Sequence, residues 1–170
     1  NCAKYIAMAI DSIQQQTLRN WELIVVDDRS TDNTDAIVHE IAAEDDRIVY
    51  LRNACNVGCY VSKNIAMSHC RGEWVTFQDA DDHSMRHRLA RQLACCQDRQ
   101  LGCCVATYLS RSTAPPSITS AQSGATAKGG SRWIPAPVTL FVRKQIFLET
   151  LGAFDSIRFG ADSEMLRRLG

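Results

Sequence analysis

Short apolar runs alternate with amphipathic segments along most of the chain. The apolar runs lack the strict polar alternation of a half-exposed strand, so each predicts a strand buried on both faces of a parallel sheet. Strands are predicted at 21–26, 48–51, 74–78, 103–108 and 139–142, and helices at 4–16, 86–98, 144–151 and around 163–169, with two more following residues 30 and 58. This order predicts an α/β fold with a Rossmann-like, mostly parallel sheet flanked by helices.

One stretch interrupts this pattern. Residues 110–132 are rich in Ser, Thr, Ala, Gly and Pro and contain no acidic residue. We predict a long flexible loop there, and the composition leaves open whether the loop is a mobile lid or a disordered segment. The chain length suits one hydrophobic core, so residues 1–170 are expected to form a single domain.

Charge and cysteine content argue against several classes of protein. Nineteen basic residues balance nineteen acidic ones, which argues against a nucleic-acid partner. No apolar run approaches the roughly 20 residues of a membrane-spanning helix. Of the eight cysteines, Cys95 and Cys96 fall in a predicted helix and Cys103 and Cys104 in a predicted strand, and no C-x-x-C pair occurs. This favours buried free thiols and a reducing compartment, so we expect a cytoplasmic protein or one held peripherally at a membrane.

Carboxylates follow two of the predicted strands. Asp27 and Asp28 end the first strand, and Asp79-Ala80-Asp81-Asp82 follows the strand at 74–78. In such sheets, ligands bind at the carboxyl ends of the strands. A concentrated negative charge there is costly unless a cation or hydrogen-bond donors occupy the site, and oxygen ligands suit Mg²⁺ or Mn²⁺. The D-x-D spacing of Asp79 and Asp81 therefore predicts a metal and a polar ligand.

The acidic strand ends also have a simpler explanation, because short acidic turns often cap the helix that follows. For the first strand, Ser30 or Asp32 can supply the cap. In that case Asp27 and Asp28 are free to accept hydrogen bonds from a nucleobase or ribose.

Three further charged residues allow two interpretations each. Lys63 follows a glycine turn and could reach a phosphate, or it could be a solvated side chain on a helix surface. Asp162 and Glu164 lie at the start of the last predicted helix, where acidic residues also compensate the helix dipole.

A set of short motifs occurs in a fixed order along the chain. They are Asn1, Ala9 to Ile13, Gln16-Thr17, Asn20 to Asp28, Ser30 to Asp32, Asn56-Val57-Gly58, Lys63-Asn64, Gly72-Glu73 and Asp79 to Asp82. Their order and spacing resemble the family 2 glycosyltransferases of GT-A fold, the fold of nucleotide-diphospho-sugar transferases. The resemblance is strong through about Gln92, thin across 110–132, and resumes at 152–169.

The resemblance implies transfer of a sugar from a nucleotide-sugar donor, usually a UDP sugar, to an acceptor hydroxyl with inversion at the anomeric carbon. It places Asp27 or Asp28 against the nucleoside, and Asp79 and Asp81 on the ribose and the diphosphate bound to Mn²⁺ or Mg²⁺. Lys63 takes the position of a basic residue that helps to hold the nucleotide.

The resemblance also indicates the other half of the reaction. Asp162 occupies the position of the general base, and the expected acceptor is a glycan or a lipid-linked sugar. Ala161-Asp162-Ser163-Glu164 replaces the commoner Glu-Asp-x-Asp, which makes Glu164 a rival base. Arg29 replaces the glycine that usually follows the paired aspartates.

The family's first strand and most of its Pro-x-x-Asn loop should precede Asn1. In the family this strand lies between the strand that ends at Asp27 and the one that ends at Asp79. We therefore expect the chain to be a fragment, truncated at both ends, with a gap or a non-native pairing between these two strands.

Two other functions fit part of the sequence. A sugar-phosphate nucleotidyltransferase has a related sheet, although the Asp27-Asp28-x-Ser-Thr-Asp turn argues against it. A non-catalytic nucleotide-sugar binding module could keep all four of Asp27, Asp28, Asp79 and Asp81 without turnover.

Overall fold

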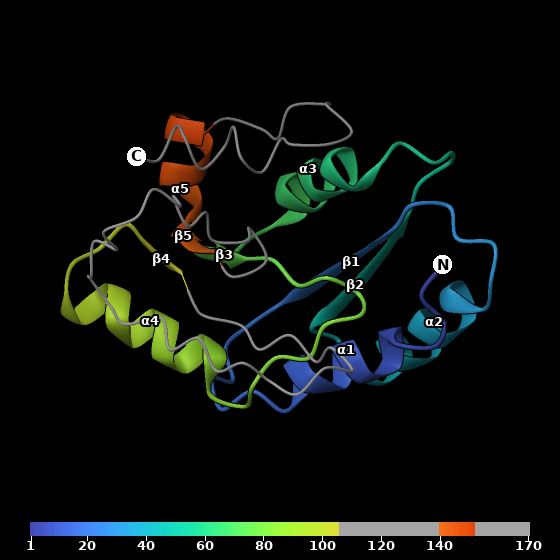
Figure 1. Cartoon of the computed structure of the whole chain (residues 1–170), viewed down its shortest axis with the longest axis horizontal. Coiled ribbons are helices and arrows are strands. Elements are labelled where there is room, and N and C mark those ends of the chain that lie inside the picture. The colour runs from blue at the N-terminus through green and yellow to red at the C-terminus, as the bar shows by residue number, and fades with distance from the viewer. Residues whose placement is uncertain (106–139, 152–170) are drawn as a thin grey trace, which may run out of the picture.

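A computed structural model describes residues 1–105 and 140–151, which form an α/β fold (Figure 1). In chain order the elements are α1 (Ile6–Gln14), β1 (Leu23–Asp27), α2 (Thr34–Glu44), β2 (Ile48–Arg52), α3 (Cys59–His69), β3 (Trp74–Thr76), α4 (Arg88–Asp98), β4 (Cys103–Val105), β5 (Leu140–Arg143), α5 (Lys144–Ile146) and the π-helical turn η2 (Phe147–Leu151). The strands and helices predicted within these ranges are confirmed, with bounds that differ by one or two residues, and the helix predicted at 144–151 consists of α5 followed by η2. The loop at 110–132 and the helix around 163–169 lie outside the described residues.

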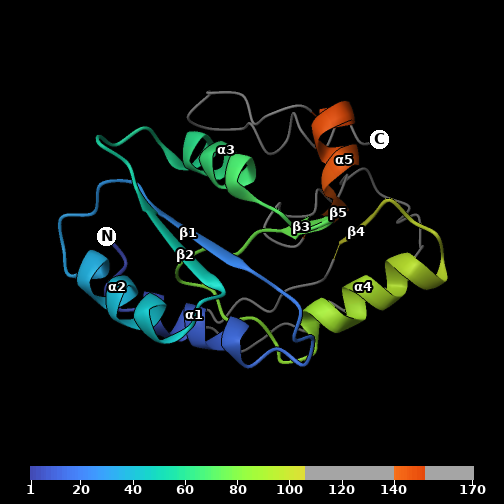
Figure 2. The same cartoon turned by 180° about the vertical axis from the view of Figure 1, so that it is seen from behind.

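The strands β1 and β2 form a parallel ladder in which Leu23 pairs with Ile48 and Asp27 with Arg52. The helix α2 makes the crossover between them, as parallel strands require. Figures 1 and 2 show α1 and α2 on one side of this ladder and α3 on the other. The register brings the acidic end of β1 beside the polar end of β2.

The remaining strands form a second ladder with β5 at its centre. This strand comes from late in the chain and runs antiparallel to both β3 and β4, so that Val142 pairs with Val75 on one side and with Cys103 on the other. Because β5 is antiparallel to both neighbours, β3 and β4 run parallel to each other. The antiparallel strand β5 is a feature that the sequence pattern did not indicate.

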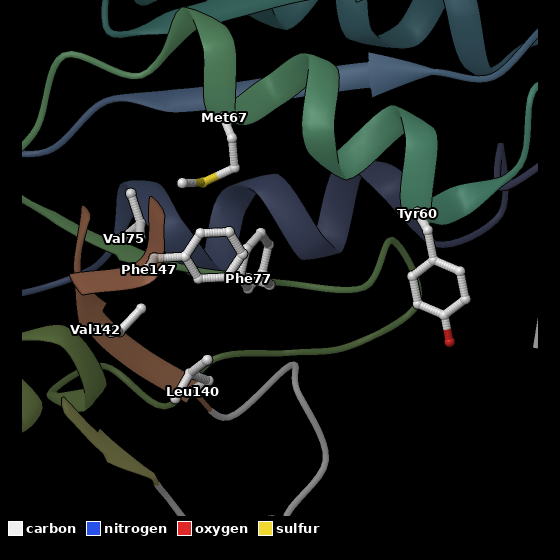
Figure 3. Close-up of a cluster of buried hydrophobic side chains, with 7 residues drawn as sticks. All are labelled: Tyr60, Met67, Val75, Phe77, Leu140, Val142 and Phe147. Atoms are coloured by element: carbon white, nitrogen blue, oxygen red, sulfur yellow. The ribbon is translucent and has the colours of Figure 1, made fainter. Parts of the chain in front are cut away.

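Two clusters of buried apolar side chains hold these elements together. The first combines α1, α2 and β2 through Ile6, Ile10, Val38 and Ile48. The second contains Tyr60, Met67, Val75, Phe77, Leu140, Val142 and Phe147 (Figure 3). In the second cluster the rings of Phe77 and Phe147 lie 5.9 Å apart, and Tyr60 stands away from the others at the start of α3. This cluster fixes α3 over β3 and β5.

No backbone ladder joins β1 to β3 within the described residues, which agrees with the expected gap between these strands. A side chain links their N-terminal ends instead. The carboxylate of Glu22 accepts hydrogen bonds from the backbone N–H groups of Arg71 (2.6 Å) and Gly72 (2.9 Å), and from Nε of Arg71 (2.9 Å). The turn between α3 and β3 is thereby bound to the start of β1.

The cysteines are free thiols, as predicted, but the prediction that they are buried is wrong for several of them. Cys96 is buried, whereas Cys55 and Cys59 are exposed. These two flank the glycine turn before α3, where the chain faces solvent. Among the helices of the described ranges, none combines the length and apolar character needed to cross a bilayer.

The Glu22 link predicts a pH-dependent contribution to stability. Burial raises the pKa of Glu22, but the hydrogen bonds from Arg71 and Gly72 outweigh burial and hold the pKa below its ordinary value of 4.5. Because folding lowers this pKa, the stabilisation is present above the unfolded-state pKa and is lost as the pH falls through the folded-state pKa. We predict that Glu22→Gln lowers the free energy of unfolding by about 1–2 kcal/mol at pH 7, and by less at pH 3.

Urea unfolding of both proteins at the two pH values measures this difference. The matched control is Glu73→Gln, since Glu73 is exposed and its carboxylate lies 3.5 Å from Arg143 in a surface ion pair. The control should change stability little. A loss for Glu22→Gln that persists unchanged at pH 3 would contradict the proposed role of the carboxylate.

Candidate active site

Asp27 is buried at the end of β1, where polar groups of the following loop and of β2 surround its carboxylate. Its Oδ1 accepts a hydrogen bond from the backbone N–H of Ser30 (2.9 Å). Its Oδ2 accepts one from the Tyr50 hydroxyl (3.0 Å) and lies 3.4 Å from Nε of Arg52. Burial raises the pKa of Asp27, but these hydrogen bonds and the Arg52 charge outweigh burial and hold the pKa below its ordinary value. Asp27 is therefore an ionised, internally bound carboxylate.

Asp28 is half-buried and binds the loop that precedes α3. Its Oδ1 accepts hydrogen bonds from the backbone N–H of Val57 (2.8 Å) and from Nδ2 of Asn53 (2.9 Å), and its Oδ2 accepts one from the N–H of Gly58 (2.7 Å). Gly58 has φ +92°, a backbone conformation that favours glycine. Burial raises the pKa of Asp28, but these hydrogen bonds outweigh it and hold the pKa below its ordinary value. The end of β1 is thereby joined to the start of α3.

The expectation that capping by Ser30 or Asp32 leaves Asp27 and Asp28 free is wrong. Asp32 does satisfy the start of α2, since its Oδ1 accepts a hydrogen bond from the backbone N–H of Thr34 (3.1 Å). The carboxylates of Asp27 and Asp28 are nevertheless occupied, because donors from β2 and the loop after it reach them. Their binding to a nucleoside stays a prediction.

Lys63 and Asp79 are brought together by the fold. Nζ of Lys63 lies 3.7 Å from Oδ1 of Asp79, and it lies 5.9 and 5.7 Å from the ring centroids of Tyr60 and Phe77. The Lys63 side chain is 20% exposed and that of Asp79 is 50% exposed. The predicted phosphate-binding cation therefore meets the first carboxylate of the D-x-D motif at the molecular surface.

The segment Asp79-Ala80-Asp81-Asp82 forms an acidic turn. Its three aspartates are exposed, and Ala80 between them is half-buried. The turn is closed by a hydrogen bond from the backbone N–H of Asp82 to the carbonyl of Asp79 (3.1 Å). Ala80 packs against the first apolar cluster, which holds the turn close to β1. Burial and the charges of Asp79 and Asp81 raise the pKa of Asp82, and Arg88 opposes this shift. The turn thus concentrates negative charge beside Lys63.

The acidic turn fits a divalent cation that is shared with a ligand. No group of three or more His, Cys, Asp or Glu side chains in residues 1–105 and 140–151 is arranged to hold a metal ion by itself. Mg²⁺ is commonly bound through one or two carboxylates, with substrate phosphates and water supplying the other ligands. Asp79 and Asp81 are exposed oxygen donors of that kind. Asp162 and Glu164, the predicted base and its rival, lie outside the described residues.

Several residues that shape the site were not identified from the sequence. Tyr50 and Arg52 hold Asp27, Asn53 holds Asp28, and Arg88 lies beneath the acidic turn. Tyr50 and Arg52 are two apart on a strand and so share a face, and Asn53 follows that strand directly. Their places on and directly after strand β2 are the only sequence signal for Tyr50, Arg52 and Asn53.

The fold is that of the GT-A glycosyltransferases. S. aureus TarS in complex with UDP aligns over 98% of this chain and 51% of its own, with a TM-score of 0.79 and 22% identity. The mannosyltransferase PcManGT from Pyrobaculum calidifontis, in complex with GDP-Man and Mn²⁺, aligns over 97% and 48% with a TM-score of 0.70 and 21% identity. At these identities the likeness establishes the fold alone.

The chain belongs to Glycosyl transferase family 2, whose sequence profile matches residues 1–162. The putative glycosyltransferase EpsE of Bacillus subtilis is 42% identical over 95 residues, which are 55% of this chain and 34% of that protein. WfaP of Escherichia coli, a UDP-Glc:alpha-D-GlcNAc-diphosphoundecaprenol beta-1,3-glucosyltransferase, is 32% identical over 93 residues, 55% of this chain and 36% of that protein. The match thus spans about a third of the length of these relatives.

Arg29 yields a prediction about the backbone at the site. This residue has φ +64°, in the left-handed region, which accounts for the glycine usual at this position. A left-handed conformation costs an L-residue roughly 1–2 kcal/mol. We predict that Arg29→Gly unfolds at a higher temperature than Arg29→Ala, by a stability difference of about 1 kcal/mol, because only glycine relieves the strain. Thermal melting of both variants measures the difference, and equal melting temperatures would show that this strain is absent in solution.

Proposed function

We propose that this chain is the catalytic domain of an inverting, metal-dependent glycosyltransferase. It transfers a hexosyl group from a UDP sugar to a hydroxyl group of a glycan or lipid-linked acceptor. The observation that carries the proposal is the assembly at the carboxyl ends of β1 and β3. Asp28 fixes the start of α3, and α3 presents Lys63 to Asp79. A cation and several carboxylates thereby converge where a nucleoside diphosphate would bind.

Of the paired aspartates, Asp28 is the better nucleoside ligand. Asp27 is 5% exposed and enclosed by Tyr50 and Arg52, whereas Asp28 is only half-buried. Besides Asn53 and the two backbone N–H groups, the Ser62 hydroxyl also interacts with the Asp28 carboxylate and helps to lower its pKa. A nucleobase N–H or a ribose hydroxyl would share or replace one of these donors at the accessible side of the carboxylate.

The diphosphate would lie between Lys63 and the acidic turn. Lys63 would bind a phosphate oxygen, and Asp79 and Asp81 would hold Mn²⁺ or Mg²⁺ together with the diphosphate. The cation, when bound, offsets negative charge that develops on the leaving diphosphate.

The transfer itself is a single displacement. The acceptor oxygen forms a bond to the anomeric carbon while the bond from that carbon to the diphosphate oxygen breaks, which inverts the configuration. The acceptor proton passes to Asp162, and Glu164 is the alternative base. A base on the acceptor side acts only in the transition state, so it contributes to turnover and not to donor affinity.

The nature of the donor and acceptor is supported by the relatives. WfaP is named for a UDP-Glc donor and a diphosphoundecaprenol-linked acceptor, and TarS was solved with UDP and with UDP-GlcNAc. A shared family and fold make a UDP sugar the first donor to test. The choice among sugars is open to direct assay.

The metal assignment predicts that Asp81→Asn weakens Mn²⁺-dependent UDP binding and lowers transfer by orders of magnitude, while the fold is retained. Calorimetric titration with UDP and Mn²⁺, together with product analysis on UDP-glucose, UDP-galactose and UDP-N-acetylhexosamines, measures both effects. Asp98→Asn, at the exposed end of α4, is the matched control and should bind and turn over as wild type does. Unchanged affinity and activity in Asp81→Asn would refute the metal role.

The same assays separate the two alternative functions. A non-catalytic binding module would bind UDP sugars and yield no product with any acceptor. A nucleotidyltransferase would form a nucleotide sugar from a sugar phosphate and a nucleoside triphosphate.

The base assignment predicts that Asp162→Asn abolishes transfer and keeps donor affinity close to that of wild type. Loss of a proton acceptor raises the barrier without removing a ground-state contact to the donor. Glu164→Gln should retain most activity. An inactive Glu164→Gln beside an active Asp162→Asn would reverse the two roles.

A further inference from the structure

The guanidinium of Arg88 lies beneath the acidic turn, at the start of α4. Each of its five N–H groups donates to a different acceptor: Nη1 to Oε1 of Gln78 (3.0 Å) and Oγ of Ser84 (2.8 Å), Nη2 to Oγ1 of Thr76 (2.6 Å) and the carbonyl of Phe77 (2.9 Å), and Nε to Oε1 of Gln92 (3.2 Å). These acceptors belong to β3, to both ends of the acidic turn and to α4. One side chain therefore joins all three segments.

The turn is bound at its base and is open at its tip. Nε2 of Gln78 donates to the carbonyl of Asp82 (2.7 Å), and Oγ of Ser84 donates to Oε1 of Gln78 (2.5 Å). From the other side, Oγ of Ser12 on α1 accepts a hydrogen bond from the backbone N–H of Ser84 (3.1 Å). Both Ser84 and Ser12 are buried, whereas the carboxylates of the turn are exposed. The polar network thus fixes the backbone from which Asp79 and Asp81 project.

The charge of Arg88 is not needed to fill this space. Burying a cation among neutral acceptors is costly, and well-packed apolar residues often replace buried charges without loss of stability. What the guanidinium supplies is five donors in one rigid plane, which fix the positions of the acceptors around them.

We infer that Arg88 is a positioning residue for Asp79 and Asp81, which holds their turn in one geometry so that both stay available to a cation shared with the donor diphosphate. This inference rests on the proposed function, because the geometry of the pair matters for binding only if the turn binds a cation. Arg88 acts through Gln78 and Ser84 and does not itself touch the ligand.

The test compares substitutions at Arg88 with the same substitutions at Arg91, which is exposed on the same helix. Titration of the full chain with Mn²⁺ at fixed UDP gives the half-saturating Mn²⁺ concentration, and urea unfolding gives stability. The substitution Arg88→Gln removes both the positive charge and the five-donor guanidinium. We expect it to raise the half-saturating Mn²⁺ concentration about ten- to a hundredfold. Arg88→Lys keeps the charge and should recover part of this loss. Arg91→Gln and Arg91→Lys should match wild type.

A purely structural role would lower stability and leave the half-saturating Mn²⁺ concentration of the folded protein unchanged, which would overturn the inference. If the Arg88 variants fail to fold, Ser84→Ala decides. It removes one acceptor of the guanidinium, and it should raise the half-saturating concentration in the same direction by a smaller factor. An unchanged value in Ser84→Ala would then overturn the inference. Failure of the wild-type chain to bind Mn²⁺ with UDP would instead refute the proposed function, and this inference with it.

Discussion

The site depends on a single strand that carries a carboxylate at each end. Asp28, after the last residue of β1, accepts hydrogen bonds from two consecutive backbone N–H groups before α3, and Glu22, before its first residue, accepts two from the turn after α3. Such charge-assisted bonds are about twice as strong as neutral ones. The helix α3 is therefore held at both ends to one strand, and this holds Lys63, in its middle, opposite Asp79. Since no ladder joins β1 to β3 in the described ranges, these bonds help to bring the two strand ends into one site.

Two cations flank the acidic turn, and their side chains suit different tasks. Lys63 is a compact charge on a flexible stem, partly exposed and 3.7 Å from Asp79, so it can exchange one anionic partner for another. Arg88 is a planar fork with five neutral acceptors, so it holds one geometry. Arginine in place of Lys63 would lose the compact charge on a flexible stem, and lysine in place of Arg88 would lose the planar group of five donors.

The sequence predicted the layout of the site better than its internal bonding. Apolar runs report burial, so β1 and β3 could be found and their acidic ends placed at one edge of a sheet. The partners of Asp28 could not be found, because its backbone donors lie 29 and 30 residues away along the chain. The departure of Arg29 from glycine was visible, but its positive φ was not. Arg88 resembles any basic residue at a helix start, and its burial arises only when β3, the acidic turn and α4 pack together.

If the proposed function holds, the acidic turn couples the binding of cation and donor. Within the described parts of the chain no preformed group of three ligands exists, so a cation at the turn depends on the diphosphate for its remaining ligands. Each partner then raises the affinity for the other by the same factor. Lys63 must give up Asp79 to reach a phosphate oxygen, and an ion pair with a half-exposed carboxylate contributes little, so this exchange costs little. The backbone of the turn does not follow the exchange, because Arg88, Gln78 and Ser84 hold it from below. Because the backbone of the turn is fixed while the ion pair between Lys63 and Asp79 can exchange, the site can bind and release a nucleotide without moving the backbone that carries Asp79 and Asp81.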